Sequence, residues 1–385
     1  MGTGHAVQCA LAALPKEGVV VVMPGDAPLI TSETLERLLS LHEGLCTVLT
    51  MTVDPPGAYG RFIRGERSYI VEAANASAEE LACTEVNSGV YAFDAAWLRE
   101  QVQGLKPHPP KGEYYLTDVI EAASAEGGLH AVLHPDADEM MGVNDRVALA
   151  VAEAALRARI NRRWLAHGVS MRDPSTTYID VGVRLEQDAR IEPGALLTGN
   201  TVVEGHSVIG AGCVLHDTHV GPRTVLKPMV VCTGVRIGSG VALGPMSQFR
   251  EGTVVDDDCK VGNFVETKKA HLHAGVKAGH LSYLGDCEIG AKTNIGAGTI
   301  TCNYDGWGKH RTTIGEGAFI GSNSALVAPA HIGAGAIVGA GSVITEPVGD
   351  DALAIGRGRQ RNLDGAAPKL HARNRLRSES SKGRK

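Results

Sequence analysis

The chain has 385 residues, of which 48 are glycine, whereas aromatic residues make up only 4%. This length suffices for two domains that each bury a core, and the composition favours short aliphatic strands joined by tight turns over a sandwich or helical-bundle core. The net charge of −6 argues against general nucleic-acid binding. Single cysteines without a C-x-x-C pair, no apolar run of about 20 residues and no signal-peptide pattern predict a cytoplasmic protein with reduced thiols and no membrane segment.

Residues 1–144 have an α/β pattern. The run VVVVM at 19–23 predicts a strand buried on both faces of a parallel sheet, Thr31 or Ser32 begins a predicted helix, and Thr47–Val53 forms a second apolar strand. Asp26 follows the first strand, at the sheet edge where ligands of α/β sheets bind, so its carboxylate is placed to hold a hard cation such as Mg²⁺. A role as a turn cap before Pro28 is the alternative.

Residues 145–168 predict a linker helix between two domains. Val147, Val151, Ala154, Ala158 and Leu165 trace one mostly apolar stripe at helical spacing, and His167-Gly168 provides a stop signal.

A six-residue period dominates residues 169–350. Aliphatic residues recur at this spacing in three runs, namely Leu185 to Leu215, Ile237 to Val261 and Ile314 to Ile344, and glycine often follows them. Such a period is neither helical nor hairpin-like, and it predicts a parallel β-helix of hexapeptide repeats in which each aliphatic side chain points into a triangular prism. The loop Lys277–Leu281 and the polar segment from Asn303 are expected to interrupt these repeats and to form a site.

Short motifs in the first segment carry a family resemblance. They are GTGHA (2–6), GD (25–26), YGR (59–61), VNSG (86–89), EYYLTD (113–118) and GVN (142–144). Their order resembles sugar-phosphate nucleotidyltransferases, and more narrowly the uridyltransferase half of the bacterial bifunctional enzymes that make UDP-N-acetylglucosamine. The resemblance implies that Asp26 and Asn144 hold Mg²⁺ and that the nucleotide-sugar contacts are Gly2, Thr3, Gly25, Asp26, Gly60, Glu72, Asn87 and Asn144. The family's glycine-rich triphosphate loop is absent from the sequence, so an incomplete domain with impaired uridyl transfer is expected.

Motifs in the repeat region resemble the acetyltransferase half of the same bifunctional family. They are FR (249–250), GNFVETKK (262–269), AGHLSYLGD (278–286) and NIGAGTITCNYDG (294–306). The resemblance implies a left-handed helix and a homotrimer with its sites in grooves between prisms. It assigns the sugar phosphate to Arg250, Lys268, Tyr283 and Asn294, and acetyl-CoA to Ala297, Asn303, Tyr304, Ser322, Ala340 and Arg357.

His280 is the candidate base. Acetyl transfer to a sugar amine requires the amine to be neutral, and histidine is the side chain that titrates nearest to neutral pH. The resemblance gives His280 this role, whereas the residue pattern alone leaves an ordinary turn histidine open.

The implied function is acetyl transfer from acetyl-CoA to glucosamine 1-phosphate, coupled to uridylyl transfer from UTP, in the synthesis of peptidoglycan and lipopolysaccharide precursors. Two alternatives stay open: a zinc-dependent hydrolyase of hexapeptide fold that uses His271, His273 and His280 across subunits, and a non-catalytic scaffold subunit. Residues 351–385 form a C-terminal extension whose basic end, from Pro368, is expected to be disordered.

Overall fold

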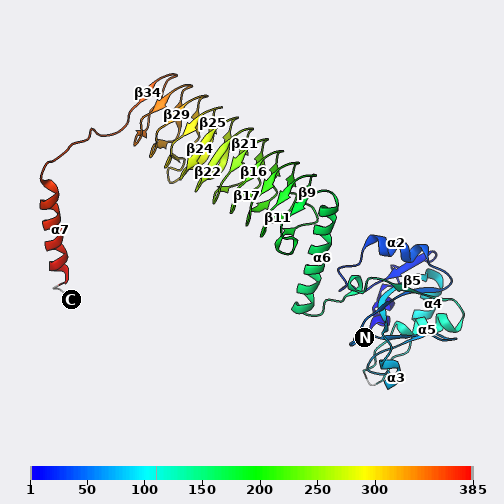
Figure 1. Cartoon of the computed structure of the whole chain (residues 1–385). Coiled ribbons are helices and arrows are strands. Elements are labelled where there is room, and N and C mark those ends of the chain that lie inside the picture. The colour runs from blue at the N-terminus through cyan, green and yellow to red at the C-terminus, as the bar shows by residue number, and fades with distance from the viewer. Residues whose placement is uncertain (1, 110, 383–385) are drawn as a thin grey trace. The chain divides into compact units, whose positions relative to one another are not determined.

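The computed structural model describes residues 2–109 and 111–382, and it divides into two compact units, Met1–Arg159 and Ile160–Lys385 (Figure 1). Residues 1 and 383–385, which belong to the predicted first domain and tail, lie outside the described residues. No helix of the described chain is long and apolar enough to cross a membrane.

The first unit is a mixed sheet with helices on both faces. Its elements, in chain order, are α1 (Thr3–Ala10), β1 (Val19–Val22), α2 (Ser32–Ser40), β2 (Cys46–Thr52), β3 (Arg61–Ile63), β4 (Tyr69–Val71), α3 (Ala78–Leu81), β5 (Glu85–Asp94), α4 (Ala95–Gly104), α5 (Thr117–Ala125), β6 (Leu129–His134) and a short 3₁₀ helix, Ala137–Met140. The strand order is β4-β3-β5-β2-β6, with β1 paired to β5.

The predicted environment of the first strand is wrong. Strand β1 is antiparallel to β5, and among the described strands it pairs with β5 alone. Its Val19 is exposed, so the strand is not buried on both faces. Strand β2 has the predicted character instead: six of its seven residues are buried, because β5 and β6 flank it on either side.

The side chains of β2 point alternately to the two faces of the sheet and contribute to the hydrophobic core on each face. Val48 packs in the cluster that includes Leu98 of α4 and Ile120 of α5, whereas its neighbour Leu49 packs with Leu38 of α2. Successive side chains of a strand point to opposite faces, so one apolar run serves two helix layers. Helix α2 begins where the sequence predicts, since the Thr31 side chain accepts a hydrogen bond from the Thr34 N–H and caps it.

Helix α6 (Arg146–Ala166) occupies the predicted linker, but its buried face differs from the predicted stripe. Val147 and Val151 are exposed, whereas Ala152, Ile160 and Asn161 are buried. The Asn161 amide donates to the carbonyls of Pro174 (2.7 Å) and Thr177 (2.9 Å), so a polar residue ties the helix end to the second unit's first turn.

The second unit is a parallel β-helix with three faces (Figure 1). Face 1 is an eleven-stranded sheet: β7 (Ser170–Met171), β10 (Arg190–Ile191), β13 (Val208–Ile209), β16 (Val225–Leu226), β19 (Ala242–Leu243), β22 (Lys260–Asn263), β24 (Lys277–His280), β26 (Asn294–Ile295), β29 (Phe319–Ile320), β32 (Ile337–Val338) and β34 (Leu353–Ala354). Every strand pairs in parallel with the strand one coil away, which is the arrangement that stacked repeats require.

Faces 2 and 3 form the other, seventeen-stranded sheet. Face 2 contains β8 (Tyr178–Ile179), β11 (Leu196–Thr198), β14 (Val214–His216), β17 (Val231–Thr233), β20 (Gln248–Phe249), β27 (Ile300–Cys302), β30 (Ala325–Val327) and β33 (Val343–Ile344). Face 3 contains β9 (Arg184–Leu185), β12 (Val202–Val203), β15 (His219–Val220), β18 (Arg236–Ile237), β21 (Val254–Val255), β28 (Thr312–Ile314) and β31 (Ala330–Ile332). Strands β23 (Glu266–Leu272) and β25 (Tyr283–Ile289) run across both faces.

The six-residue period produces the prism directly. Leu197, Val203, Ile209 and Leu215 are all fully buried, and they belong to one core cluster that runs through the unit. Corners require left-handed backbone, and non-glycine residues adopt it repeatedly, as at His206, Asp258 and Leu281. This repeated cost of positive φ is offset by the continuous aliphatic column inside.

The C-terminal extension is helical where the sequence predicts disorder. Helix α7 spans Ala366–Lys382, with Pro368 in its first turn, where a proline is tolerated. Its side chains are exposed wherever the structure describes them, except for the half-buried Ala366.

Candidate active site on the β-helix and a cleft in the first unit

One corner of the prism aligns the predicted base with the predicted acetyl-CoA residues. We call the corner between faces 1 and 2 the first corner. Strand register places Asn263 beside His280, and the same register continues one coil at a time through the corner. The residues that follow His280 along it are Ala297, Ser322, Ala340 and Gly356, and Arg357 comes directly after Gly356 in the chain. At about 4.8 Å per coil, the column from His280 to Gly356 is about 19 Å long.

Close backbone stacking holds this corner. A Cβ at Gly296 would lie 2.5 Å from the Ser322 nitrogen, and one at Gly262 would collide with the Gly279 carbonyl oxygen. Further along the column, Arg357 donates to the Ala340 carbonyl at 2.6 Å. The corner is therefore a groove wall of backbone and small side chains that a long, thin ligand can follow.

Asn263 sets the orientation of His280. Its Oδ1 lies 2.7 Å from His280 Nδ1, and because an amide oxygen only accepts, Nδ1 carries the proton. In the neutral ring, Nε2 is then the atom with a free lone pair, and the side chain is exposed. The sequence motif contains Asn263, but its position 17 residues earlier gives no sign of this contact.

The expectation that Lys277–Leu281 interrupts the repeats is wrong. Strand β24 stays in register with both β22 and β26, and Ala278 lies in the core. His280 therefore lies on a regular corner. The true interruption follows Asn303, where a turn returns at His310, whose N–H donates to the Asn303 carbonyl.

Asp305 organises this insertion. Its carboxylate accepts hydrogen bonds from the backbone N–H groups of Trp307 (2.8 Å) and Gly308 (2.7 Å) and from His310 Nε2 (2.7 Å). Those donors, with the Gly308 N–H first, hold the pKa of Asp305 below its ordinary value. Lys309 Nζ lies 4.5 Å from the centre of the Tyr304 ring, so the two side chains stack on the protruding turn.

The second corner, between faces 2 and 3, carries the predicted phosphate ligands. Register brings Arg250 beside Lys268 and Lys268 beside Gly285. The Arg250 guanidinium lies 3.0 Å from the Glu266 carboxylate, an ion pair that limits its rotation. Two cationic residues thus lie side by side on successive coils at the second corner.

Tyr283 and Asn303 meet over Gly285 at this corner. A Cβ at Gly285 would lie 2.5 Å from the Tyr283 hydroxyl oxygen and 2.8 Å from Asn303 Nδ2. Asn303 Nδ2 also donates to Asp286 Oδ2. Because Gly285 has no side chain, both polar groups fit at the second corner. Asn294 lies elsewhere, facing outward from face 1.

The two corners are separated by the width of face 2. Five residues link His280 to Gly285, which at about 3.3 Å per residue is about 16 Å. A single chain therefore presents the predicted base and the predicted phosphate ligands on different edges of the prism.

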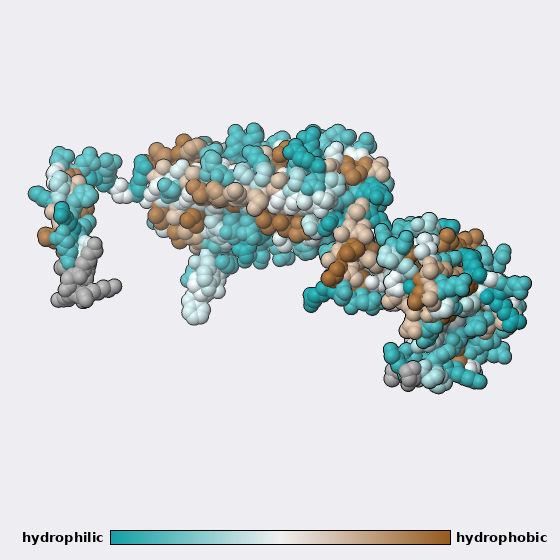
Figure 2. All heavy atoms as spheres, turned by 60° about the horizontal axis from the view of Figure 1, so that its bottom comes forward, coloured by the Kyte–Doolittle hydropathy of each residue, from teal (hydrophilic) through white to brown (hydrophobic). Residues whose placement is uncertain are grey.

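Outward side chains differ among the faces. In the last coils, face 1 exposes Phe319, Ile337 and Leu353, and face 2 exposes Ile300 and Val343. Face 3 presents Glu288, Thr313 and His331 there instead. Figure 2 shows apolar patches among polar side chains on the visible side of the coils.

In the first unit, Asp26 and Asn144 line one cleft. The cleft has a volume of about 360 Å³ and is also lined by Pro24, Ala27, Ala58, Tyr59, Ser88, Met140 and Gly142. A Cβ at Gly142 would lie 3.3 Å from Asp26 Oδ2 and 3.6 Å from Asn144 Nδ2, so both polar groups approach this glycine. A carboxylate and an amide oxygen are suitable ligands for a hard cation such as Mg²⁺.

The other predicted contacts of the first unit form a separate group. Asn87 donates its backbone N–H to the Gly60 carbonyl, and a Cβ at Gly60 would lie 3.7 Å from Glu72 Oε2. Burial, and then the charge of Glu113, raises the pKa of Glu72. Gly2 stacks on Tyr114, and Thr3 accepts from the Leu116 N–H at 3.0 Å. Gly25 lies next to Asp26 in the chain, and none of these residues lines the cleft itself.

Comparisons with known proteins agree with this architecture. The family model described as "Bacterial transferase hexapeptide (six repeats)" matches residues 311–346. Bifunctional protein GlmU of Trichlorobacter lovleyi is 45% identical over 379 residues, covering 95% of this chain and 81% of that protein. GlmU of Stutzerimonas stutzeri is 47% identical over 370 residues, and that of Staphylococcus haemolyticus 44% over 373 residues, each covering 95% of this chain and 82% of the relative.

This chain belongs to the GlmU family. Identity of this level over nearly the whole chain confirms the resemblance that the sequence motifs indicate. The fold is that of the GlmU family as predicted, a nucleotidyltransferase-like α/β unit followed by a left-handed parallel β-helix.

GlmU membership does not favour the zinc-hydrolyase and scaffold alternatives. Within the chain, moreover, His280 lies on the first corner, whereas His271 and His273 lie on face 3 with Asp256. His271 and His273 form a cluster with Asp256, and His280 is not part of it.

Proposed function

We propose that this protein transfers the acetyl group of acetyl-CoA to glucosamine 1-phosphate, with His280 as the base, and that it thereby makes the N-acetylglucosamine 1-phosphate used for UDP-N-acetylglucosamine. Membership of the bifunctional GlmU family gives the activity. The observation that best supports the residue assignment is the first-corner column, which puts His280 in line with Ala297, Ser322 and Ala340, and Arg357 donates a hydrogen bond to the Ala340 carbonyl.

His280 Nε2 is the proposed acceptor of the amine proton. The amine nitrogen of the sugar attacks the thioester carbonyl carbon and its proton moves to Nε2. The C–S bond then breaks, and the leaving CoA thiolate takes that proton from Nε2 to depart as the free thiol. Asn263 keeps Nδ1 protonated throughout, so Nε2 is available at the start of each turnover. No acyl-enzyme is needed, because the two substrates react directly.

Arg250 and Lys268 are the proposed ligands of the sugar phosphate. Two fixed cations suit a dianionic phosphate, and the Arg250–Glu266 pair holds the guanidinium in place before the substrate arrives. Tyr283 and Asn294 are proposed to contact the sugar, and Asn303 and Tyr304 to lie near the thioester. Acetyl-CoA would lie along the first-corner column, whose length of about 19 Å suits an extended pantetheine arm.

The active unit is proposed to be a homotrimer. About 16 Å separates the first and second corners of one chain, which is too far for one small sugar phosphate to touch both backbones. A groove between two chains would bring the first corner of one prism to the second corner of its neighbour. The exposed apolar side chains flank the first corner on faces 1 and 2, where such a neighbour would cover them.

Asp26 and Asn144 are the proposed ligands of Mg²⁺ for uridylyl transfer. The ion would neutralise phosphate charge, and Asp26 and Asn144 would hold the ion at the wall of the cleft. Gly2, Thr3, Gly25, Gly60, Glu72 and Asn87 are proposed to contact the nucleotide-sugar. The described lining of this cleft contains no Lys or Arg, so we expect uridylyl transfer from UTP to be far slower than acetyl transfer. We place both reactions in the cytoplasm.

The decisive experiment measures CoA release with glucosamine 1-phosphate. His280→Ala should lower kcat about 10²- to 10⁴-fold with little change in the thermal midpoint, since the side chain is exposed. His331→Ala, which removes a histidine of face 3 that contacts Thr313, is the matched control and should keep wild-type turnover. Equal turnover of wild type and His280→Ala would reject His280 as the base, and absence of any CoA release from the wild type would reject the function.

A further inference from the structure

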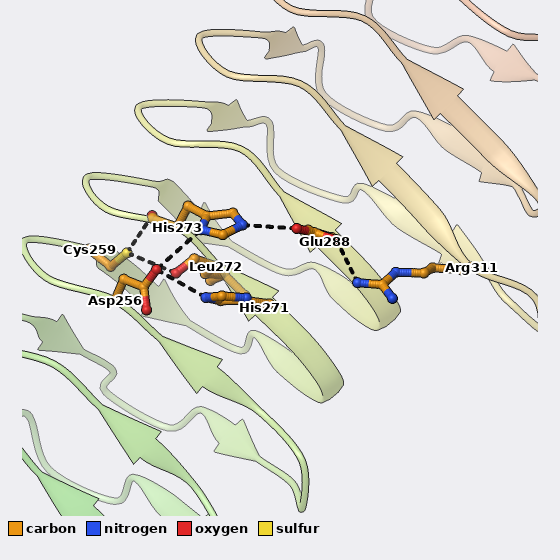
Figure 3. A network of polar contacts seen from close by, with 7 residues as sticks. All are labelled: Asp256, Cys259, His271, Leu272, His273, Glu288 and Arg311. Atoms are coloured by element: carbon orange, nitrogen blue, oxygen red, sulfur yellow. Dashed lines mark hydrogen bonds and ion pairs between the residues drawn. The ribbon is translucent and has the colours of Figure 1, made fainter.

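Face 3 carries a cluster of metal-ligating side chains that the acetyltransferase site does not use. Asp256, His271 and His273 each offer one ligand atom, and these three atoms lie within 4.8 Å of one another. Figure 3 shows the three side chains together. His271 Nε2 lies 3.0 Å from Asp256 Oδ2, and His273 Nδ1 lies 3.2 Å from the same oxygen. The residues come from adjacent coils: Asp256 directly follows β21, His271 lies in β23 and His273 directly follows β23, so the pairing of these strands fixes the spacing.

The two distances to Asp256 Oδ2, 3.0 and 3.2 Å, are close to the ligand spacing of a transition-metal site. Four ligand atoms at about 2.0–2.1 Å from a tetrahedral ion lie about 3.3 Å from one another. Asp256, His271 and His273 side chains are each about one-third exposed, so solvent can occupy the remaining position. Two imidazoles and a carboxylate suit Zn²⁺ better than Mg²⁺ or Ca²⁺, which prefer oxygen ligands.

Glu288 provides the outer contact that ligand histidines usually have. Its Oε1 lies 3.1 Å from His273 Nε2, and Arg311 in turn donates to its Oε2 at 2.6 Å (Figure 3). A neutral histidine has one N–H and cannot donate to Asp256 and Glu288 together. With a metal ion on Nδ1, the single proton lies on Nε2 and donates to Glu288, the arrangement typical of zinc sites.

Cys259 supports the site without being a ligand. Its thiol donates to the His273 carbonyl oxygen, at 3.1 Å, from inside the prism (Figure 3). The cysteine is fully buried, so its sulfur faces the core rather than the metal-binding surface.

We propose that Asp256, His271 and His273 bind one Zn²⁺ ion per chain on face 3, apart from the acetyltransferase site. The ion would join two successive coils through β21 and β23. Strand β23 also carries Lys268 three residues before His271, so bound zinc would stiffen the strand that holds a proposed phosphate ligand.

Titration calorimetry of the untagged full chain, stripped with EDTA and then titrated with ZnCl₂, tests this proposal. We expect one site per chain whose affinity falls at least tenfold in Asp256→Asn and beyond detection in the double variant His271→Ala/His273→Ala. Glu288→Gln should weaken binding about 10- to 100-fold, as loss of an outer-shell partner does.

His219→Ala is the matched control, because His219 forms a similar pair with Glu204 on face 3, at 2.7 Å, but has no second histidine beside it. The control should bind zinc as the wild type does, and circular dichroism should show all variants folded. Unchanged zinc binding in the double variant, or no binding by the wild type, would overturn the proposal.

Discussion

At the residue scale, pairs from successive coils determine what each proposed group can do. His280 depends on Asn263, and Arg250 depends on Glu266. The motifs identify His280 and Arg250 by type, but their partners lie 17 and 16 residues away and become neighbours only because the next coil runs beside them. The sequence therefore predicts the candidate groups, whereas their protonation and orientation come from the stacking.

Asn263→Ala should separate positioning from catalysis. Removing the amide oxygen lets the His280 ring adopt the other tautomer, so we expect kcat to fall about tenfold while KM for glucosamine 1-phosphate changes little. Steady-state kinetics of both proteins with glucosamine 1-phosphate provide the readout. Asn263→Asp, which keeps an acceptor oxygen, should recover part of kcat, and a kcat equal to wild type in Asn263→Ala would contradict the role.

Gly285→Ala should impair sugar binding without unfolding the protein. The new methyl group would displace the Tyr283 hydroxyl and the Asn303 amide, both of which are side-chain ends rather than backbone. We expect KM for glucosamine 1-phosphate to rise several-fold and the thermal midpoint to change by only a few degrees. A large loss of stability with unchanged KM would show that Tyr283 is not at the site.

At the element scale, the coil is the unit that the sequence encodes. Its six-residue period predicts the prism, and the buried aliphatic residues confirm it. Helix α6 and strand β1 show the limit of such patterns, because their apolar residues are partly exposed. In these two elements the neighbouring segments, and not the local spacing, decide which face is buried. His280 is a third example: the segment Lys277–Leu281 was expected to interrupt the repeats, but strand β24 stays in register with its neighbours.

Gly262→Ala tests the close stacking of the first corner. Its Cβ would collide with the Gly279 carbonyl oxygen, which is backbone and cannot rotate away. We expect the variant to lose about 1–3 kcal/mol of unfolding free energy, measured by chemical denaturation. Gly279→Ala is the matched control, since a Cβ there meets nothing within 4 Å. Equal midpoints for the two variants would show that the corner can relax.

At the scale of the whole molecule, the asymmetry of the faces indicates how chains meet. Faces 1 and 2 expose apolar side chains beside the first corner, whereas face 3 presents polar ones at the same level. Burial of apolar surface drives stable association, so the proposed trimer uses faces 1 and 2 and leaves the zinc site on face 3 in solvent.

Phe319→Glu should weaken the trimer. Its side chain is 49% exposed in one chain, and a charge at this position would have to be desolvated in an interface. Light scattering after gel filtration should show a smaller mass and CoA release should fall in parallel. Thr313→Glu, on face 3, is the control that should stay trimeric, and trimeric, active Phe319→Glu would place the interface elsewhere.

The rate at which cysteine thiols react with a reagent should show whether the β-helix is folded. Burial raises the pKa of Cys259 to about 11 and that of Cys287 to about 12, so both stay protonated and unreactive at pH 8. The buried cysteines Cys46, Cys213 and Cys232 should be protected as well, whereas the exposed Cys9 should react first with a disulfide reagent. Denaturant should make all eight react, and fast labelling of Cys259 in the native protein would contradict the buried column.

The sequence by itself determined the repeat, the family and the residue types that can do chemistry. These depend on local spacing and on short motifs, which can be read directly from the sequence. Only the tertiary structure decided that His280 shares one corner with Ala297, Ser322 and Ala340, that the proposed phosphate ligands lie on the next, and that two histidines of the zinc alternative join Asp256 instead. Each of those outcomes depends on which residues one coil places above another, and insertions such as Asn303–His310 change that count without changing the motif.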